Sequence, residues 1–229
     1  MRFLSFLLLI GIPVLVASQA SKTCRTRTHE PVTEPITEPI TTKPTTKPTT
    51  KPTTKKPATC PSGWTLVQRS IGGWCIRVFN GMNNQTESMK ACQTRGAVLS
   101  GAESASELAT MAALGRELLA TSVSNWQYGT LRMAIERPNV NGVSIIFEHK
   151  NAWRVTDGNN NGGTAGMVWG PGEPNKDKLA YEDKNCAMLF LALPGAPPTV
   201  RVHGTLQTFI CHITWFDMLR GYVCGRRAT

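Results

Sequence analysis

The sequence predicts an exported protein whose folded part is one domain of helices and short strands. Three observations predict it: an apolar N-terminal segment, six cysteines from Cys60 onward, and two helical patterns among short β-prone runs. The folded part has about 165 residues, which is enough for a single domain with a real hydrophobic core.

Residues 1–20 are typical of a secretory signal peptide. Arg2 precedes an apolar run, and small residues lead to a cleavage site after Ala20. The run is too short to favour a membrane-spanning helix, and Pro13 interrupts it. We therefore expect a secreted, extracellular protein with no membrane span. An uncleaved anchor is the alternative interpretation.

Residues 21–59 predict an extended, mucin-like stalk. From 30 to 54 the sequence repeats Glu-Pro-x-Thr units and then Lys-Pro-Thr-Thr units. A proline at every fourth position prevents both a helix and a central strand, and little apolar surface is present to offset the entropy cost of ordering. Dense threonine beside proline in an exported chain favours O-glycosylation, and an unmodified flexible tether is the alternative.

Seven cysteines in an exported chain indicate disulfide bonds. Six lie in the folded part, and their spacing does not fit a zinc site. Cys24 is the odd one and precedes the stalk, so either it joins two chains into a dimer or it is a capped thiol. Two heads on long tethers would gain avidity through their effective concentration.

The positive charge is unevenly placed along the chain. Residues 21–59 hold eight Lys or Arg and three Glu, so about half of the formal net charge of +10 precedes Cys60. Nucleic-acid binding requires basic residues clustered on one folded face, and an exported protein seldom meets nucleic acid. We expect no nucleic-acid partner, whereas weak attraction to sulfated glycans or anionic lipids fits the charge.

A β-hairpin opens the folded part. The runs 65–70 and 74–79 are β-prone and are separated by Ile-Gly-Gly. A bridge between Cys60 and Cys75 would staple this hairpin. Further along the chain, the apolar run 186–193 has the length of a strand and predicts one that is buried.

The first helix is predicted shortly after the hairpin. Thr86 is its expected N-cap, Met89 and Cys92 fall on one face, and Gly96 is placed to end it. Asn84 begins an Asn-Gln-Thr sequon, so Asn84 is the expected attachment point of an N-linked glycan.

The second helix has the clearer pattern. Ser104 and Glu107 form a capping box at its start. An apolar stripe predicts the face that packs in the core: Leu108, Met111, Leu114, Leu118 and Leu119.

Five motifs follow one another through the folded part. They read CPSGW, MKACQTRGAVLS, WRVTDG…GTAGMVWGPGEPN, NCAMLF and RGYVCG. In this order they resemble a C-type lectin-like domain, particularly the secreted lectin-like proteins of nematodes. The resemblance covers residues 60–225 and leaves 226–229 as a tail. It implies an α+β C-type lectin-like fold, in which two helices flank small antiparallel sheets, the chain ends pair, and a long loop region carries the ligand site.

The resemblance also selects one of the disulfide patterns that six cysteines allow. It implies three pairs: Cys60–Cys75, Cys92–Cys224 and Cys186–Cys211. The second pair would close the longest loop and contribute about 4–5 kcal/mol on a chain-entropy model.

The resemblance implies a calcium-dependent sugar site. In family members that bind sugar, a Glu-Pro-Asn loop, a nearby Glu and a Trp-Asn-Asp stretch hold the ion, which coordinates two sugar hydroxyls. Glu173 and Asn175 match the loop here, and a cis peptide before the intervening proline would turn both side chains inward. Glu182 or Asp183 could supply the nearby carboxylate.

Other parts of that calcium site depart from the family pattern. Leu206, Gln207 and Thr208 stand at the Trp-Asn-Asp positions, where Gln207 offers an amide oxygen and Thr208 only a neutral hydroxyl. The Trp-Ile-Gly core strand is replaced by residues 132–134, Arg-Met-Ala. Calcium affinity follows the number of carboxylates, so the site is incomplete, and Glu173 and Asn175 could instead bind a hydroxyl directly.

The main functional hypothesis is a secreted lectin that presents a glycan-binding head on a stalk, in surface defence or innate immunity. Its partners would be glycans or a glycoprotein. The alternative is a calcium-independent, protein-binding lectin-like domain, and a cationic structural secretion is a third hypothesis. We do not expect an enzyme, because the four histidines have no nucleophile or carboxylate partner evident in the sequence.

Overall fold

The computed structural model describes residues 57–122, 124–138, 150–175 and 184–229. The predicted signal peptide, Cys24 and the predicted stalk up to residue 56 lie outside these residues; only residues 57–59 of the stalk are described. The elements, in chain order, are β1 (Thr65–Arg69), β2 (Gly72–Asn80), α1 (Gln85–Gln93), β3 (Val98–Leu99), α2 (Ala105–Ala120), β4 (Tyr128–Glu136), the 3-10 turn η1 (Lys150–Ala152), β5 (Arg154–Val155), β6 (Cys186–Ala192), β7 (Leu206–Phe209) and β8 (Leu219–Arg227). In the described part of the chain, no helix has both the length and the apolar character needed to cross a membrane.

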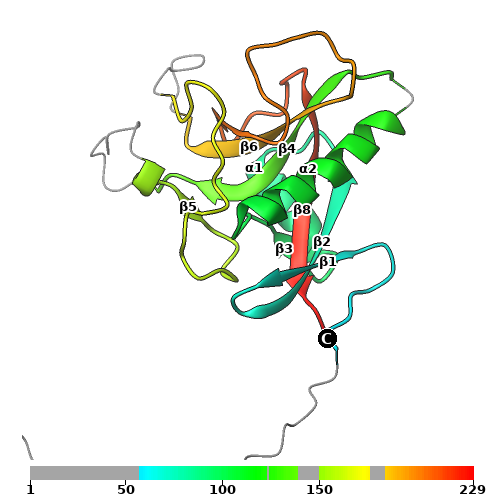
Figure 1. The fold of residues 1–229 in the computed structure, drawn as a ribbon, viewed down its shortest axis with the longest axis vertical. Helices are drawn as coiled ribbons and strands as arrows, with labels where there is room; N and C mark the ends of the chain where they lie inside the picture. Colours follow the sequence, from blue (N-terminus) through cyan, green and yellow to red (C-terminus); the bar gives the residue numbers. More distant parts are fainter. Residues whose placement is uncertain (1–56, 123, 139–149, 176–183) are drawn as a thin grey trace, which may run out of the picture. The chain divides into compact units, whose positions relative to one another are not determined.

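One mixed sheet forms the framework (Figure 1). Its strand order is β1-β2-β8-β4-β6-β7, with β3 beside β8 and β5 beside β4. The β1–β2 pairing confirms the predicted hairpin. The pairing of β4 with β8 is parallel and the other pairings are antiparallel. The expected small antiparallel sheets are therefore joined into one, because β8 returns beside β4 in the centre.

The two ends of the folded part lie side by side (Figure 1). The backbone N–H groups of Thr59 and Thr229 donate to each other's carbonyl oxygens at 2.9 and 3.0 Å. Strand β8 continues to Arg227, and the Ala228 N–H donates to the Gly73 carbonyl. The expectation of a tail at 226–229 is thus wrong, since these residues pair with the start of the domain.

Helix α1 begins two residues earlier than the sequence predicts. Asn84, not Thr86, is the N-cap: its Oδ1 accepts from the Glu87 N–H, and Glu87 Oε2 accepts from the Asn84 N–H, both at 2.9 Å. This reciprocal pair satisfies two N–H groups that a helix start leaves open. Met89 does not share the buried face expected for it: it is 43% exposed, while Cys92 is buried.

Helix α2 begins at the predicted residue but with only half of the capping box. Ser104 Oγ accepts from the Glu107 N–H at 3.2 Å. The Glu107 carboxylate does not return to Ser104; it accepts from the Glu103 N–H at 2.8 Å and pairs with Arg69. The buried guanidinium outcompetes the cap, because a buried carboxylate requires a charged partner.

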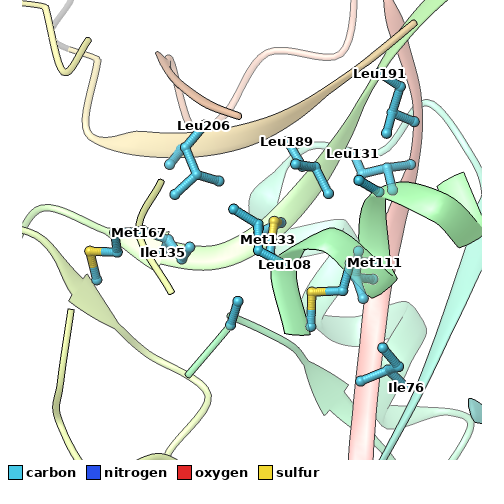
Figure 2. Close-up of a cluster of buried hydrophobic side chains, with 14 of the residues drawn as sticks. Ile76, Leu108, Met111, Leu131, Met133, Ile135, Met167, Leu189, Leu191 and Leu206 are labelled. Carbon is cyan, nitrogen blue, oxygen red and sulfur yellow. The ribbon is translucent and has the colours of Figure 1, made fainter. Parts of the chain in front are cut away.

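The main core lies between α2 and the sheet (Figure 2). Leu108, Met111 and Leu119 are buried, and Leu114 and Leu118 are partly buried against the same cluster, so the predicted stripe is confirmed. Figure 2 shows Leu108 and Met111 of α2 on the side of the apolar residues of β4 and β6, such as Leu131 and Leu189. Full burial of one such side chain stabilises the fold by about 1.5–3 kcal/mol.

Three disulfides join described cysteines, in the pattern that the resemblance implies. They are Cys60–Cys75, Cys92–Cys224 and Cys186–Cys211, with Cα–Cα distances of 5.6, 5.4 and 5.1 Å. The predicted strand at 186–193 forms β6 and is buried except at its end. Two helices on a sheet, the paired ends and these three bridges confirm the α+β, disulfide-stapled C-type lectin-like fold.

Candidate functional site

The loop at 169–175 bends as predicted. The Glu173–Pro174 peptide bond is cis, and Pro174 is buried. Both flanking side chains consequently face each other: Asn175 Nδ2 donates to Glu173 Oε1 at 2.8 Å, and the Asn175 backbone N–H donates to Glu173 Oε2 at 3.0 Å. Both residues are half-buried, so the pair lies at the surface of the domain.

Strand β7 holds this loop in place. Trp169 forms a parallel bridge with Leu206, the Gly170 N–H donates to the Leu206 carbonyl at 3.0 Å, and the Leu206 N–H donates to the Val168 carbonyl at 2.8 Å. Trp169 also packs edge-on against buried Trp153, with ring centroids 4.9 Å apart. The indole therefore serves the core, as its apolar bulk favours.

Thr208 contacts the same carboxylate from β7. Its N–H and its Oγ–H both donate to Glu173 Oε2, at 3.1 and 2.7 Å. With the bond from Asn175, this one oxygen accepts three hydrogen bonds. Thr208 was expected to be a poor metal ligand, and here it acts as a donor that holds Glu173 in place.

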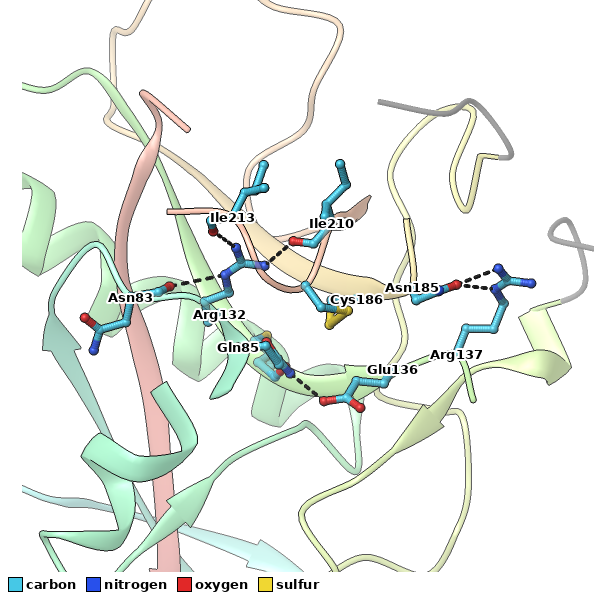
Figure 3. Close-up of a disulfide and its surroundings, with 11 residues drawn as sticks. Asn83, Gln85, Arg132, Glu136, Arg137, Asn185, Cys186, Ile210 and Ile213 are labelled. Carbon is cyan, nitrogen blue, oxygen red and sulfur yellow. Dashed lines mark hydrogen bonds between the residues drawn. A yellow bond between two sulfur atoms is a disulfide. The ribbon is translucent and has the colours of Figure 1, made fainter. Parts of the chain in front are cut away.

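The Glu173–Asn175 pair has one more hydrogen-bond partner among the described residues, and it is the ammonium group of a lysine. Lys184 Nζ donates to Asn175 Oδ1 at 2.7 Å. Lys184 lies two residues before Cys186, which is fixed by its disulfide. The next residue, Asn185, is also held, because its Oδ1 accepts from Arg137 Nε at 3.1 Å (Figure 3). The ammonium group therefore comes from a well-anchored part of the chain.

The described residues do not fit a calcium ion at this loop. Calcium requires six to eight oxygen ligands, several of them charged. Here Glu173 Oε2 already accepts three hydrogen bonds, Oε1 accepts one, and Asn175 Oδ1 faces an ammonium group. An ion would have to displace Lys184. Among the residues that the structure describes, no group of three or more His, Cys, Asp or Glu side chains could hold a metal.

One further predicted ligand that the structure describes, Gln207, is not brought to the loop. Gln207 lies opposite Met188 in the β6–β7 pairing, and its strand neighbour Phe209 packs in the same cluster as Met188. Successive side chains of a strand point to opposite faces, so Gln207 points away from Thr208 and Glu173. Gln207 therefore does not share a face with Thr208, and its role as a ligand stays a prediction. Glu182 and Asp183 lie outside the described residues.

Sequence reasoning missed Lys184, although a signal was present. The expected partner of the loop is a metal ion, for which the carboxylates before Cys186 are the candidate ligands. A lysine placed between those carboxylates and the cysteine can supply the same positive charge.

A second residue missed by sequence reasoning is Arg132, which is buried beside the Cys186–Cys211 disulfide (Figure 3). Its guanidinium donates to three backbone carbonyls: Ile210 at 2.8 Å, Ile213 at 2.6 Å and Asn83 at 3.4 Å. Burial lowers the pKa of Arg132 to about 10, and the nearby Glu87 charge opposes this shift. Arg132 thereby fixes the segment that follows β7.

Asn84, the predicted glycosylation residue, is half-buried at the start of α1. Its Oδ1 is the capping atom, whereas a glycan would be attached to Nδ2. Capping and glycosylation therefore use different atoms, and glycosylation at Asn84 stays a prediction.

No family model and no curated protein matches the sequence. Among solved structures, the chain is similar to the cow C-type carbohydrate-recognition domain of CD23, crystallised with GlcNAc2Man3 oligosaccharide: 21% identity over 75% of this chain and 98% of that one, with a TM-score of 0.47. It is also similar to a calcium-independent type II antifreeze protein, with 17% identity over 76% and 98% of the chains and a TM-score of 0.47. The mouse scavenger receptor C-type lectin carbohydrate-recognition domain shares 14% identity over 75% and 100%, with a TM-score of 0.46.

Proposed function

We propose that the head is a carbohydrate-binding lectin domain that recognises sugar hydroxyls without calcium. The site would be the cluster of Glu173, Asn175 and Lys184, called here the ligand cluster. The single observation that carries the proposal is the 2.7 Å contact between Lys184 Nζ and Asn175 Oδ1, which supplies the loop with a hydrogen-bond donor from the protein itself.

The ligand cluster has hydrogen-bonding capacity to spare. An ammonium group has three N–H donors, of which Lys184 uses one within the described residues. Within the same described residues, the side-chain amide of Asn175 uses one of its two N–H donors, and Glu173 Oε1 accepts a single hydrogen bond. All three residues are half-buried and so accessible from solvent.

A sugar hydroxyl both donates and accepts, so this mixture of groups suits it. One hydroxyl could accept from Lys184 Nζ while a neighbouring hydroxyl donates to Glu173 Oε1. Hydrogen bonds to charged groups are the stronger kind, which supports recognition without a metal. Thr208 and the cis bend would keep the carboxylate oriented before the ligand arrives, and preorganisation reduces the entropy cost of binding.

The rest of the hypothesis concerns the whole chain. We propose that the protein is secreted, that residues 21–59 hold the head away from a surface, and that Cys24 joins two chains. A role in surface defence would follow from glycan recognition at a distance. Loss of the disulfide-linked dimer on a non-reducing gel after Cys24→Ser would support the link through Cys24.

A glycan array tests the proposed function. The secreted full-length chain is applied with calcium and, separately, with a chelator. We expect the same glycans to bind in both conditions, Lys184→Gln to abolish the signal, and Lys90→Gln, which removes an exposed lysine of α1, to leave it unchanged.

Two outcomes of the array would reject the proposal. Signal that disappears with chelator would show that a metal is required. Absence of any glycan signal, together with recovery of a protein partner, would favour the calcium-independent protein-binding alternative.

A further inference from the structure

Three arginines gather on the face of the sheet that α1 covers; we call Arg77, Arg95 and Arg226 the arginine patch. Arg77 and Phe79 share one face of β2, because side chains two residues apart point the same way. Arg226 of β8 pairs with Cys75, which makes it the diagonal neighbour of Arg77 on that face. Arg95 follows the end of α1.

Phe79 holds two of these guanidinium groups. The Cζ atoms of Arg77 and Arg95 lie 5.1 and 4.5 Å from the centroid of its ring. The two positive charges are therefore within about 10 Å of each other. Trp64 packs edge-on against the same ring, and Tyr222 stacks on it, with centroids 5.9 and 5.8 Å away. The ring is thus a fixed platform.

Arg226 joins the patch beside the turn that ends α1. Its Nη1 would lie 3.7 Å from a Cβ atom on Gly96, the residue after Arg95. Gly96 has a φ of +63°, which favours glycine. A shallow hollow of about 310 Å³ adjoins this point and is lined by Gly96, Asn159 and Arg226 among others. The patch therefore borders an accessible concave surface.

Within the described residues, no carboxylate forms an ion pair with the patch, although Glu117 lines the same pocket as Arg77. Both ion pairs found in this part of the chain belong to Arg69. Arg95 donates instead to the Ala91 carbonyl and to Thr94 Oγ1. Arg77 and Arg95 are exposed and Arg226 is half-buried. Like charges held this close repel each other, and a bound anion would relieve that repulsion.

We propose that the arginine patch binds a sulfated polysaccharide. A guanidinium is a planar fork of N–H donors that matches an oxyanion with two parallel hydrogen bonds. Contact with the Phe79 ring already restrains the guanidinium groups of Arg77 and Arg95, so less side-chain entropy is lost on binding. An elongated polyanion can meet all three groups, whereas a single small anion cannot.

A polysaccharide fits the patch better than a membrane does. Phe79 and Trp64 are the aromatic side chains next to the arginine patch. Both are partly buried and offer no apolar group for insertion into lipid. The patch also lies on the face opposite Trp74 and Ile76, which belong to the main core.

Binding to heparin, a sulfated polysaccharide, tests the proposal. The secreted full-length chain is titrated at several NaCl concentrations. Arg77→Gln combined with Arg95→Gln should weaken binding by about tenfold or more, because hydrogen bonds to charged groups are lost. Arg154→Gln combined with Arg201→Gln removes the same charge from exposed positions outside the patch, and should change the affinity by less than about twofold.

Further variants test whether the guanidinium geometry matters and control for a double variant that fails to fold. Arg77→Lys with Arg95→Lys keeps the charge but loses the planar fork, so an intermediate affinity is expected. Arg226→Gln removes no stacking on Phe79; it should weaken binding even if the double variant fails to fold. Lys184→Gln should leave heparin binding unchanged, which separates the patch from the ligand cluster.

Three results would overturn the proposal. Equal losses for the two double glutamine variants would mean that net charge alone drives binding. An unchanged heparin affinity of the Arg226→Gln variant would exclude the arginine patch as the binding surface. Binding to phosphatidylserine vesicles without binding to heparin would assign the surface to a membrane.

Discussion

Two polar clusters of this domain, each with one cationic side chain and at least one carboxylate, use similar groups in opposite ways. The Arg69 cluster is closed: the side chains of Arg69, Glu107 and Asp157 are 0–2% exposed, and the two ion pairs are 2.7 and 2.9 Å long. Arg69 also donates to Gly101 and Asn159 carbonyls. The ligand cluster is open: its lysine is half-buried and makes one hydrogen bond within the described residues.

The comparison distinguishes a cluster that stabilises the fold from one that is proposed to bind a ligand. Every donor of Arg69 is used, so this cluster can only hold β1, α2 and the 157–159 turn together. In the proposed function, the remaining donors and acceptors of the ligand cluster bind the sugar. Breaking a buried ion pair costs about 3–5 kcal/mol, whereas an exposed pair contributes about 0–1 kcal/mol. The two clusters should therefore respond very differently to substitution.

The largest effect is expected for Arg69→Met. The substitution leaves the carboxylates of Glu107 and Asp157 buried without their cation, so the free energy of unfolding should fall by about 3–5 kcal/mol. Guanidinium denaturation with the disulfides intact measures it. A loss below about 1 kcal/mol would show that this cluster is no more essential than a surface pair.

Arg132→Met should have an intermediate effect. It leaves three backbone carbonyls without their donor but strands no buried carboxylate, so a loss of about 1–3 kcal/mol is expected. The same denaturation experiment applies. A loss as large as that of Arg69→Met would contradict the view that stranded carboxylates dominate the difference.

Lys184→Gln should barely change stability. The half-buried lysine contributes one hydrogen bond, so the free energy of unfolding should change by less than about 1 kcal/mol while glycan binding is lost. Equilibrium denaturation beside the glycan array measures both. Loss of stability comparable to that of Arg132→Met would make the cluster structural.

The smallest effect concerns His203 and appears only as a pH dependence. Its Nδ1 accepts from the Ala192 N–H at 3.1 Å, and burial, with a smaller contribution from Arg116, lowers the pKa of His203 below 6.5. The unfolded chain therefore binds the proton first, so stability falls as the pH drops below about 6.5. His203→Asn keeps an acceptor and should flatten this slope in thermal melts. An unchanged slope would contradict the assignment.

The sequence predicts the fold and two of the three residues of the candidate site, Glu173 and Asn175, but not Lys184. The hairpin and the Leu108–Leu119 stripe follow from local patterns, whereas the bent Glu173–Asn175 pair and the disulfide pairing follow from the resemblance. The strand face of Gln207 could not be predicted, because it depends on pairing register, which local sequence does not specify. Arg132 was missed because arginine is rarely fully buried, and only tertiary packing supplies its three carbonyl partners.

The most direct test of the calcium-free ligand cluster is a calcium titration followed by thermal unfolding of the secreted full-length chain. A ligand that binds only the folded state raises its melting temperature. With Lys184 in place, the melting temperature should be the same in chelator and in calcium up to the millimolar range where extracellular modules bind. A saturable rise of the melting temperature with calcium would contradict the account.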